Sequence, residues 1–557
     1  MIKFTHITRF LFILGLLSLP LAARQPGVAK SVNMGPTGIR VLITKEQPNY
    51  FKVEKVEANS PATGLLNPND VIIGANGKVM DVSQNFHFFV SQAGPVQEMA
   101  KLIEDSQAKD GKLELMVWPG GDKAKQKTVT VKIDVLGRFS PTFPFDCKRS
   151  DLVLRNLRDH IAGLSKTDPL FRQLPHAYTA CILSLMGTND PKYDKVVNDF
   201  FKGYYKKRYN AASGRSYGGR KATWWNINDS VLLGEYYLLT GDDKLKPVMK
   251  SLSDCIKSSI YPIDGGMPHM PYAAFEQRRQ AGGSHRRYIS MSAPSTVAML
   301  GMSLFKEAGL PHSGDTYERM HAAILSTVDE HGAIGYYAKK WDNEIIALDD
   351  KNGSPKPSPL GIGFECEEGM KGIGKFTVVN SKNRDTSWLA DEADTNRVYT
   401  LKDNKRLVVR HMPPKEPTEP IKLVEGPTHD IGRSGAAALA HSIGNQNNQS
   451  WGYLSDFMAK SCANSPDQLL AGHASAHTHV MWGSLGARLA APEAFRKYMD
   501  GIKWWLIMAQ KHDGNYDRNY GRTDGMLGAR NLPTGAAAII LSMKDKALRI
   551  TGRPAAK

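Results

Sequence analysis

From about residue 150 onward the sequence alternates two unlike kinds of helix, and this pattern constrains the fold more than any other feature. One segment of each pair is rich in small and apolar residues, and an amphipathic segment follows it after a turn of Gly, Asp or Pro. Four of the small-residue segments read SVLLGEYYLLTGD, STVAMLGMSLFKEAG, HVMWGSLGARLAAPE and GAAAIILSMKD. Because one hairpin cannot bury its apolar face alone, the repetition predicts hairpins stacked on their neighbours. The small residues predict a closely packed inner layer that the other helices cover.

The spacing of apolar residues predicts helices in the following segments. They are Asp151–Gly163, Pro175–Leu185, Tyr193–Tyr205, Ile227–Leu239, Lys244–Ser258, Ser295–Glu307, Tyr317–Asp329, Gly435–Ile443, Tyr453–Cys462, Ala474–Leu489, Pro492–Ala509 and Thr534–Leu541. Residues 338–428 interrupt this pattern with Gly- and Pro-rich stretches and with short alternating segments such as KRLVVRHM. A β-rich insertion is therefore expected there, placed either at the mouth of a site or as a solvent-exposed elaboration.

The recurring hairpins, together with the Gly-rich endings HGAIGYY and HDGNY, resemble the α/α toroid of terpene cyclases, protein prenyltransferases, bacterial glycosidases and polysaccharide lyases. The resemblance implies an all-α ring of about six hairpins, with residues 150–337 and 429–550 as its two halves. The Asp-rich DxDD run of the cyclases is absent, and so are zinc ligands at the spacing of the prenyltransferases. The resemblance therefore implies an architecture but no particular reaction.

Residues 30–137 show a different pattern of short β signals and Gly, Pro and Asn turns. GPTGIRVLI runs from a turn into a β-branched strand, and YFKVEKVEA alternates apolar and polar residues. The order SPA, GL, NDVI and NG between Ser60 and Gly77 resembles the circularly permuted bacterial type of PDZ domain, although Asn69 replaces the usual Gly before the Asp. The chain is therefore expected to be a multidomain protein, with a small α+β PDZ domain ahead of the helical region.

The PDZ resemblance implies a groove that binds the C-terminus of a peptide. Backbone N–H groups of the first loop would bind the peptide's carboxylate, the following strand would pair with the peptide, and a helix would line the side-chain pocket. The implied residues are Gly35, Pro36, Thr37, Gly38 and Ile39 in the loop and strand, and Val96 and Ala100 on the helix. A PDZ-shaped unit that serves only for packing or docking is the alternative.

The first residues predict export. Lys3 and Arg9 precede an apolar run from Phe10 to Leu19, and small residues follow at Ala22 and Ala23. This is the pattern of a signal peptide over residues 1–23, and the run is too short to span a bilayer. The mature chain is thus expected in the periplasm or outside the cell, without a transmembrane anchor. Signal peptide, PDZ and toroid in this order resemble an uncharacterised family of exported bacterial proteins.

Charge and missing motifs narrow the partners. The formal net charge is +17, and the basic residues are spread along the chain. Such a surface favours anionic polymers, but we find no P-loop, dinucleotide fingerprint, GxSxG elbow or nucleic-acid motif. The five cysteines include no CxxC pair, which argues against a thiolate zinc site. The sequence predicts no cofactor and no nucleic-acid partner, and favours an anionic polysaccharide.

The segment GHASAHTHVMWG, from Gly472 to Gly483, holds the densest group of histidines. His473 and His477 are predicted catalytic residues, because an imidazole can act as general acid or base near neutral pH. Their i,i+4 spacing would also allow one metal ion, but no third ligand lies nearby in the sequence, so no metal site is assigned.

A second polar cluster, KHDGNYDRNYGRTDG, supplies Tyr516, Asp517 and Arg518 as further catalytic candidates. In a polysaccharide lyase, Arg would neutralise a uronate carboxylate while Tyr or His moves protons. In a glycosidase, Asp513 or Asp517 would pair with Asp229 as acid and base. A surface network of ion pairs is the structural alternative.

Aromatic residues mark a third candidate site. KATWWNINDS places Trp224 and Trp225 beside Asp229, a combination that suits stacking on a sugar ring with hydrogen bonds to its hydroxyls. The sequence as a whole predicts an exported carbohydrate-active or glycan-binding protein, a lyase or hydrolase of an anionic polysaccharide, with a peptide-docking PDZ domain. The alternative is a scaffold without enzyme activity that binds proteins through both domains.

Overall fold

The structure is a computed structural model that divides into two compact units. The sheet unit consists of Met1–Arg138, Trp504–Asp513 and Asp517–Thr523, and the helical unit of Phe139–Lys503, Gly514–Tyr516 and Asp524–Lys557. The residues that the structure describes are 30–84, 94–168, 171, 175–209, 222–260, 265–268, 271–274, 291–310, 316–325, 327–335, 346–347, 364–365, 375–376, 397–400, 406–411, 416–424, 431–445, 447–468, 476–517 and 531–555. The predicted signal peptide, residues 1–23, lies outside them.

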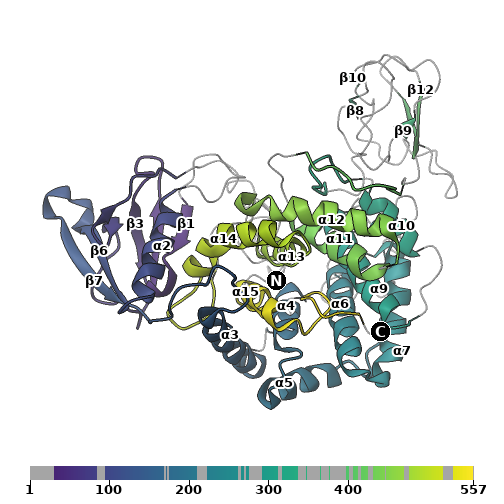
Figure 1. Cartoon of the computed structure of the whole chain (residues 1–557), viewed down its shortest axis with the longest axis horizontal. Helices are drawn as coiled ribbons and strands as arrows, with labels where there is room; N and C mark the ends of the chain where they lie inside the picture. The colour runs from purple at the N-terminus through teal and green to yellow at the C-terminus, as the bar shows by residue number, and fades with distance from the viewer. Residues whose placement is uncertain are drawn as a thin grey trace, which may run out of the picture. The chain divides into compact units, whose positions relative to one another are not determined.

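The sheet unit is built on one antiparallel sheet with the strand order β1-β2-β3-β4-β6-β7, in which β5 also pairs with β4 (Figure 1). Its elements are β1 (Lys30–Asn33), β2 (Ile39–Ile43), β3 (Phe51–Val56), β4 (Val71–Ala75), β5 (Lys78–Val79), α2 (Pro95–Gln107), β6 (Lys112–Trp118) and β7 (Lys127–Lys132). Ile39, Val41 and Ile43 alternate with half-buried residues along β2, so the period of two places them in the core. The expected α+β character of this region is confirmed.

Both edges of β2 are already paired. β1 pairs antiparallel with β2, with Val32 opposite Val41, and β3 pairs along the other edge. The sequence-based interpretation, in which a peptide adds as a strand at Ile39–Ile43, therefore finds no free edge while β1 is in place. The loop expected to bind the carboxylate, Gly35–Thr37, is a short 3-10 turn whose three residues are buried.

The remaining residues expected to form the groove are also enclosed. Val96 and Ala100 of α2 belong to the core of the sheet unit, with at most 1% of their surface exposed. A Cβ atom at Gly35 would lie 3.0 Å from the carbonyl oxygen of Ile507, so the Trp504–Asp513 segment covers this loop. Gly38 has a φ of 74°, in the left-handed region that favours glycine. The loop thus serves packing within the sheet unit, and a segment far along the chain completes it.

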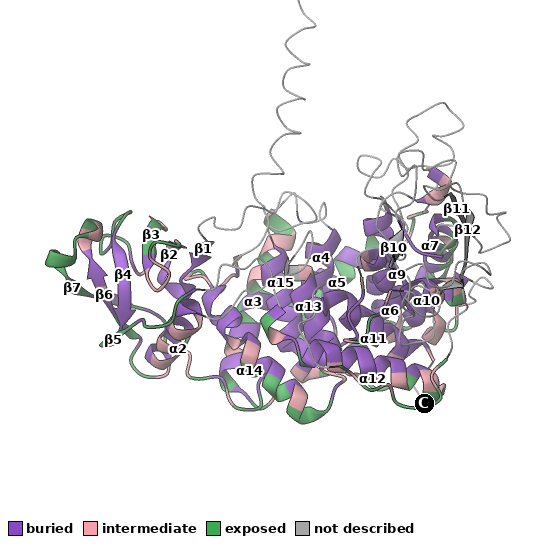
Figure 2. Cartoon of the chain, turned by 90° about the horizontal axis from the view of Figure 1, so that it is seen from above, coloured by how far each residue is buried: buried purple, intermediate pink, exposed green. Residues whose placement is uncertain are grey.

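The helical unit contains the small-residue helices predicted from the sequence. Its helices are α3 (Lys148–Thr167), α4 (Pro175–Leu185), α5 (Pro191–Lys202), α6 (Ala222–Thr240), α7 (Lys246–Ser259), α9 (Ser292–Glu307), α10 (Thr316–Leu325), α11 (Ile431–Gly444), α12 (Gln449–Ala463), α13 (Ala476–Ala487) and α15 (Leu532–Leu541). α14 (Pro492–Met508) begins in this unit and ends in the sheet unit. Helices α4, α6, α9, α11, α13 and α15 each contact the next in this order, and α15 contacts α4. Figure 2 shows these six helices as mostly buried. They are called the inner helices below.

Glycine and serine let the inner helices approach closely. A Cβ atom at Gly301 of α9 would lie 1.8 Å from Ser230 Oγ of α6, and one at Gly435 of α11 would lie 2.0 Å from the Trp482 carbonyl oxygen of α13. Neither position accepts a side chain without displacing its neighbour, which explains the composition of these segments. Gly234 packs on Leu304, one turn beyond the first pair. Because the contacts advance in step along α6 and α9, these two helices run parallel.

Short strands lie in the region between the helical segments. They are β8 (Ile346–Ala347), β9 (Phe364–Glu365), β10 (Lys375–Phe376), β11 (Arg397–Thr400) and β12 (Arg406–His411). β10 pairs with β8, and β12 pairs with both β11 and β9, all antiparallel. None of the helices in the described part of the chain is long and apolar enough to cross a membrane. The protein is thus a multidomain protein with an N-terminal antiparallel sheet and many helices.

Candidate functional site

Two histidines and a Trp–Asn pair lie at the N-terminal ends of the inner helices. The His176 ring, in the first turn of α4, meets the Trp224 ring of α6 edge-on, with centroids 4.9 Å apart. Asn228 follows one turn later on α6, and His479 of α13 is close enough to act on the charge of His176. All four side chains are buried, with less than 7% of their surface exposed. Residues from three helices thus meet in one buried polar cluster, called the inner-end cluster below.

The hydrogen bonds of Asn228 fix the proton on His176. Asn228 Nδ2 lies 2.8 Å from the Trp224 carbonyl oxygen, which can only accept, so the amide nitrogen must face it. The same Nδ2 is 3.4 Å from His176 Nδ1, so this ring nitrogen accepts a long hydrogen bond. Burial, helped by the nearby His479, lowers the pKa of His176 to about 3. His176 is therefore neutral at ordinary pH and carries its single ring proton on Nε2.

The inner-end cluster holds polar atoms that lack a partner. His176 Nε2, a donor, and Asn228 Oδ1, an acceptor, are buried and have no hydrogen bond among the residues that the structure describes. The hydroxyls of Thr179 on α4 and Thr223 on α6 are in the same state. Each such atom costs about 1–3 kcal/mol when it stays unpaired. A group of donors and acceptors without partners is what a site for a polar ligand offers.

The next residue on α6, Asp229, has hydrogen-bond partners for both of its carboxylate oxygens. Its Oδ1 accepts hydrogen bonds from the Tyr178 and Tyr204 hydroxyls at 2.8 and 2.7 Å. Its Oδ2 accepts from Lys207 Nζ and the Tyr209 hydroxyl, each at 2.6 Å. The carboxylate is fully buried, whereas Lys207 keeps 37% of its side chain exposed. Burial and the Asp229 charge raise the pKa of Tyr178 and Tyr209 well above the usual value, so both stay hydroxyl donors.

Lys207 completes this arrangement, which we call the Asp229 cage. Its ammonium lies 4.6 Å from the ring centroids of both Tyr204 and Tyr209, so it sits against two aromatic rings as well as the carboxylate. With four donors, Asp229 has no oxygen left for a substrate or for proton transfer. We therefore assign it a role in holding α4, α6 and the chain after α5 together.

The structure separates the residues that the sequence grouped as catalytic. His473 and Arg518 lie outside the described residues; His477 falls within α13, but its side chain is not described. Tyr516 belongs to the helical unit and is 2% exposed, which leaves little surface for a substrate. Asp517 belongs to the sheet unit, where Arg40 lies 3.5 Å from it. These two adjacent residues thus belong to different units.

Unlike the catalytic candidates, the ligand-binding candidates lie on a single helix. Trp224, Trp225 and Asp229 all lie on α6, and Trp224 belongs to the inner-end cluster. Trp225 is 8% exposed, so among the described residues neither tryptophan offers an open face for stacking. Sequence reasoning missed His176, because the single histidine in PHAYTACILSL looks like a core residue. Asn228 was visible as an amide inside an otherwise apolar helix.

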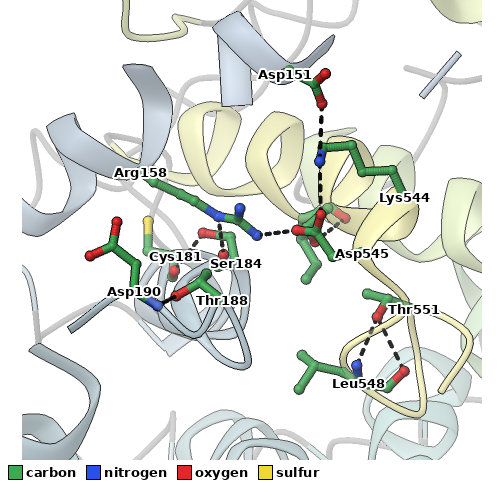
Figure 3. Close-up of polar contacts among 12 residues, drawn as sticks. Asp151, Arg158, Cys181, Ser184, Thr188, Asp190, Lys544, Asp545, Leu548 and Thr551 are labelled. Atoms are coloured by element: carbon green, nitrogen blue, oxygen red, sulfur yellow. Dashed lines mark hydrogen bonds and ion pairs between the residues drawn. The ribbon is translucent and has the colours of Figure 1, made fainter. Parts of the chain in front are cut away.

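The helical unit also contains an open cleft between α3, the loop that joins α4 to α5, the start of α5, and Lys544 beyond α15, with a volume of about 520 Å³. It is lined by Asp151, Leu154, Arg155, Arg158, Asp159, Thr188, Asp190, Lys192, Tyr193 and Lys544. Figure 3 shows Arg158 pointing to Asp545, and Lys544 placed between Asp151 and Asp545. Lys192 pairs with Asp159 in the same way. Carboxylates balance most of the cations that line the cleft, so the cleft shows little preference for an anion.

Metal-ligating side chains do not cluster in the described part of the chain. Within the described ranges, no group of three or more His, Cys, Asp or Glu side chains could hold a metal ion. The four described cysteines are buried free thiols, at positions 147, 181, 255 and 462. Burial raises the pKa of Cys255 to about 12, so this thiol stays protonated.

A family model described as Domain of unknown function (DUF6288) matches residues 150–371 and 423–552. The match covers more than half of the chain, so the protein belongs to this family. The matched residues include the inner helices, the inner-end cluster and the Asp229 cage, and leave out the sheet preceding them. Searches of the curated proteins and of the solved structures find no match.

Proposed function

We propose that the protein is an exported carbohydrate-active or glycan-binding protein that takes an anionic polysaccharide at the inner-end cluster. In this proposal residues 150–337 and 429–550 form an α/α toroid interrupted by a β-rich insertion, and residues 30–137 form a PDZ-like domain. The closed cycle of contacts among the inner helices supports the toroid. The order of strands and turns between Ser60 and Gly77 supports the PDZ-like assignment.

The observation that carries the proposal is the unpaired donor and acceptor at the inner end. A sugar hydroxyl both donates and accepts, so it can pair with the His176 Nε2 proton and with Asn228 Oδ1 together. The Trp224 ring meets the His176 ring edge-on and so helps to fix the orientation of the imidazole. A site built to pair with a hydroxyl rejects ligands that lack one, because its own buried groups then stay unpaired.

Two further features support an anionic sugar. The N-terminal ends of α4, α6 and α13 bring residues into this cluster, and helix N-termini carry partial positive charge that favours a carboxylate. The net charge of +17 favours encounter with a polyanion.

The protonation of His176 limits its own chemical role. A pKa of about 3 leaves no imidazolium to act as acid near neutral pH, and Nδ1 is engaged by Asn228. His176 is therefore assigned to binding and orientation. Proton transfer, if the protein is a lyase or hydrolase, is assigned to His473 and His477, and neutralisation of a uronate carboxylate to Arg518; these are the sequence candidates whose side chains lie outside the described ones.

The test uses the purified mature chain and a panel of uronate-containing and neutral polysaccharides. New unsaturated ends would establish a lyase, new reducing ends a hydrolase, and calorimetric binding without products a glycan-binding protein. Asn228→Leu is expected to weaken binding at least tenfold, because it removes the acceptor and both amide donors. Lys192→Met, in the open cleft, is the matched control and should bind as the wild type does. Absence of products and of binding across the panel would remove the proposal and leave the scaffold interpretation.

A further inference from the structure

A chain of hydrogen bonds connects two buried histidines to one carboxylate on the helical unit. His441, in the last turn of α11, lies with Nε2 3.0 Å from Nδ1 of His321 on α10. Nε2 of His321 lies 3.0 Å from Glu416 Oε1. Trp451 of α12 stacks on the His321 ring at 4.5 Å between centroids, with 12° between the planes. This cluster shares no residue with the inner-end cluster.

The acceptors along this chain of hydrogen bonds determine where the protons of His321 and His441 lie. His441 Nδ1 is 2.7 Å from the Ala437 carbonyl oxygen, which can only accept, so Nδ1 carries a proton. Burial, with His321 nearby, lowers the pKa of His441 to about 3, so its Nε2 has a lone pair and accepts from His321. The hydrogen bond from His321 lowers the pKa of Glu416, so the carboxylate accepts as well. Both ring nitrogens of His321 must therefore donate, which makes this ring an imidazolium.

Glu416 belongs to the segment of the helical unit that follows the short strands in the chain and that the structure describes over residues 416–424. We call Glu416–Val424 the return strap. Its other end is held by His331 Nδ1, 2.8 Å from the Val424 carbonyl oxygen, and by a hydrogen bond from the Val424 amide to the Glu330 carbonyl oxygen at 3.0 Å. A neutral histidine can donate from Nδ1, so this second attachment needs no extra proton. The attachment through Glu416 therefore depends on the protonation of His321, whereas the attachment at Val424 can form with a neutral histidine.

We propose that His321 and Glu416 form a proton-operated latch for the return strap, closed when His321 is doubly protonated and open when it loses one proton. Losing that proton leaves His321 with one N–H for two acceptors, His441 and Glu416. His441 is 1% exposed and fixed within α11, whereas 43% of the Glu416 side chain is exposed. The carboxylate therefore leaves, and it takes the beginning of the strap away from α10.

Other charged groups near the latch come from the surrounding helices. On α10, Glu318 acts on Tyr317, whose ring stacks on Trp451 at 5.3 Å. On α9, Lys306 lies over the Tyr317 ring at 5.3 Å from its centroid. Trp451 also donates a side-chain hydrogen bond to Glu416. Within the described residues, the titratable groups that touch His321 itself are thus Glu416 and His441.

The test measures strap release in the full mature chain as a function of pH, over the range in which the protein stays folded. The readout is the rate of trypsin cleavage after Lys422, an exposed residue of the strap, normalised to a free peptide of the same sequence. Imidazole NMR of selectively labelled protein gives the titration of His321 in parallel. The wild type should be cleaved about tenfold faster above this titration than below it, as expected for the loss of one hydrogen bond between charged groups.

Three variants decide the outcome. Glu416→Gln removes the charge without a large change of shape, and should abolish the pH dependence of cleavage; His321→Gln should do the same. His331→Gln is the matched control at the other end of the strap, and should raise cleavage at every pH while keeping the tenfold ratio. A wild-type ratio in Glu416→Gln, or a step in cleavage that does not coincide with the His321 titration, would overturn the latch. The proposed function plays no part in either result.

Discussion

Asn228 and Asp229 are neighbours on one helix, yet their polar atoms are in opposite states. Asp229 accepts four hydrogen bonds and has no lone pair left for a ligand. Asn228 is equally buried and leaves its carbonyl oxygen without a partner in the described structure. The charged residue therefore belongs to the architecture, and the neutral one marks the candidate site. Buried charge is a poor guide to function here, and an unpaired buried acceptor is a better one.

The largest effect on stability is expected from a substitution in the Asp229 cage. Asp229→Asn keeps the shape but removes the charge that Lys207 and three tyrosine hydroxyls surround. The expected loss in free energy of unfolding is about 3–5 kcal/mol, because the partners of a broken buried ion pair stay desolvated. Chemical denaturation measures it. A loss below about 1 kcal/mol would mean that the cage contributes little to stability, contrary to our assignment.

Removing a single hydrogen-bond donor from the Asp229 cage should have a smaller effect on stability. Tyr178→Phe deletes one hydroxyl from the Asp229 cage and should cost about 1.5–3 kcal/mol, the usual value for a hydrogen bond to a charged group. Tyr237→Phe is the matched control, because that hydroxyl donates to the exposed Asp243 at 3.1 Å. Equal effects of the two substitutions on the unfolding free energy would contradict the distinction between the cage and the surface.

The protonation of His176 gives the inner-end cluster a dependence on pH. Its pKa is about 3 when folded and near 6.5 when unfolded, so the unfolded chain binds more protons between these values. Stability should therefore fall as the pH drops from about 6.5 to 3, by about 1.4 kcal/mol per pH unit from this residue. In His176→Gln, the free energy of unfolding should fall less steeply as the pH drops, by about 1.4 kcal/mol per pH unit. Since the other groups titrate alike in both proteins, identical slopes would refute the assignment.

The smallest effect on stability is expected at Asn228. Asn228→Leu removes an unpaired acceptor, and this gain offsets part of the loss of the Nδ2 hydrogen bonds to the Trp224 carbonyl oxygen and to His176, so we expect a loss of about 1 kcal/mol in the free energy of unfolding. The same variant should lose polysaccharide binding. A large loss of stability would show that Asn228 is structural, as Asp229 is, and would erase the contrast between the two residues.

The sequence predicted the segments but not this division of roles. Small residues on alternate helices indicated the inner helices, because close approach requires them. KATWWNINDS was predicted as a ligand-binding segment, and Trp224 does belong to the inner-end cluster. The donors of the Asp229 cage could not be assigned, since Tyr178 and Tyr204 are 51 and 25 positions away. No local signal distinguishes a tyrosine that binds a carboxylate from one that packs in a core.

The sheet unit illustrates the same limit. Alternation and turn residues predicted its strands, including Ile39–Ile43. They did not reveal that KSVN would pair along β2, because four residues carry too little pattern to define a strand. Nor did they indicate that the Trp504–Asp513 segment joins this unit, with Lys511 within 3.3 Å of Glu57. Pairings between distant parts of a chain depend on the folded backbone, which local periodicity does not encode.

The imidazole nitrogens of His176 offer the most direct test of the inner-end cluster. Selective labelling and nitrogen NMR report which ring atom carries the proton, with and without a uronate oligosaccharide. We expect one neutral ring protonated at Nε2 from pH 5 to pH 8, and a shift of that N–H when the saccharide is added. A proton on Nδ1, an imidazolium in this range, or an unchanged Nε2 signal with a saccharide that demonstrably binds would contradict the account.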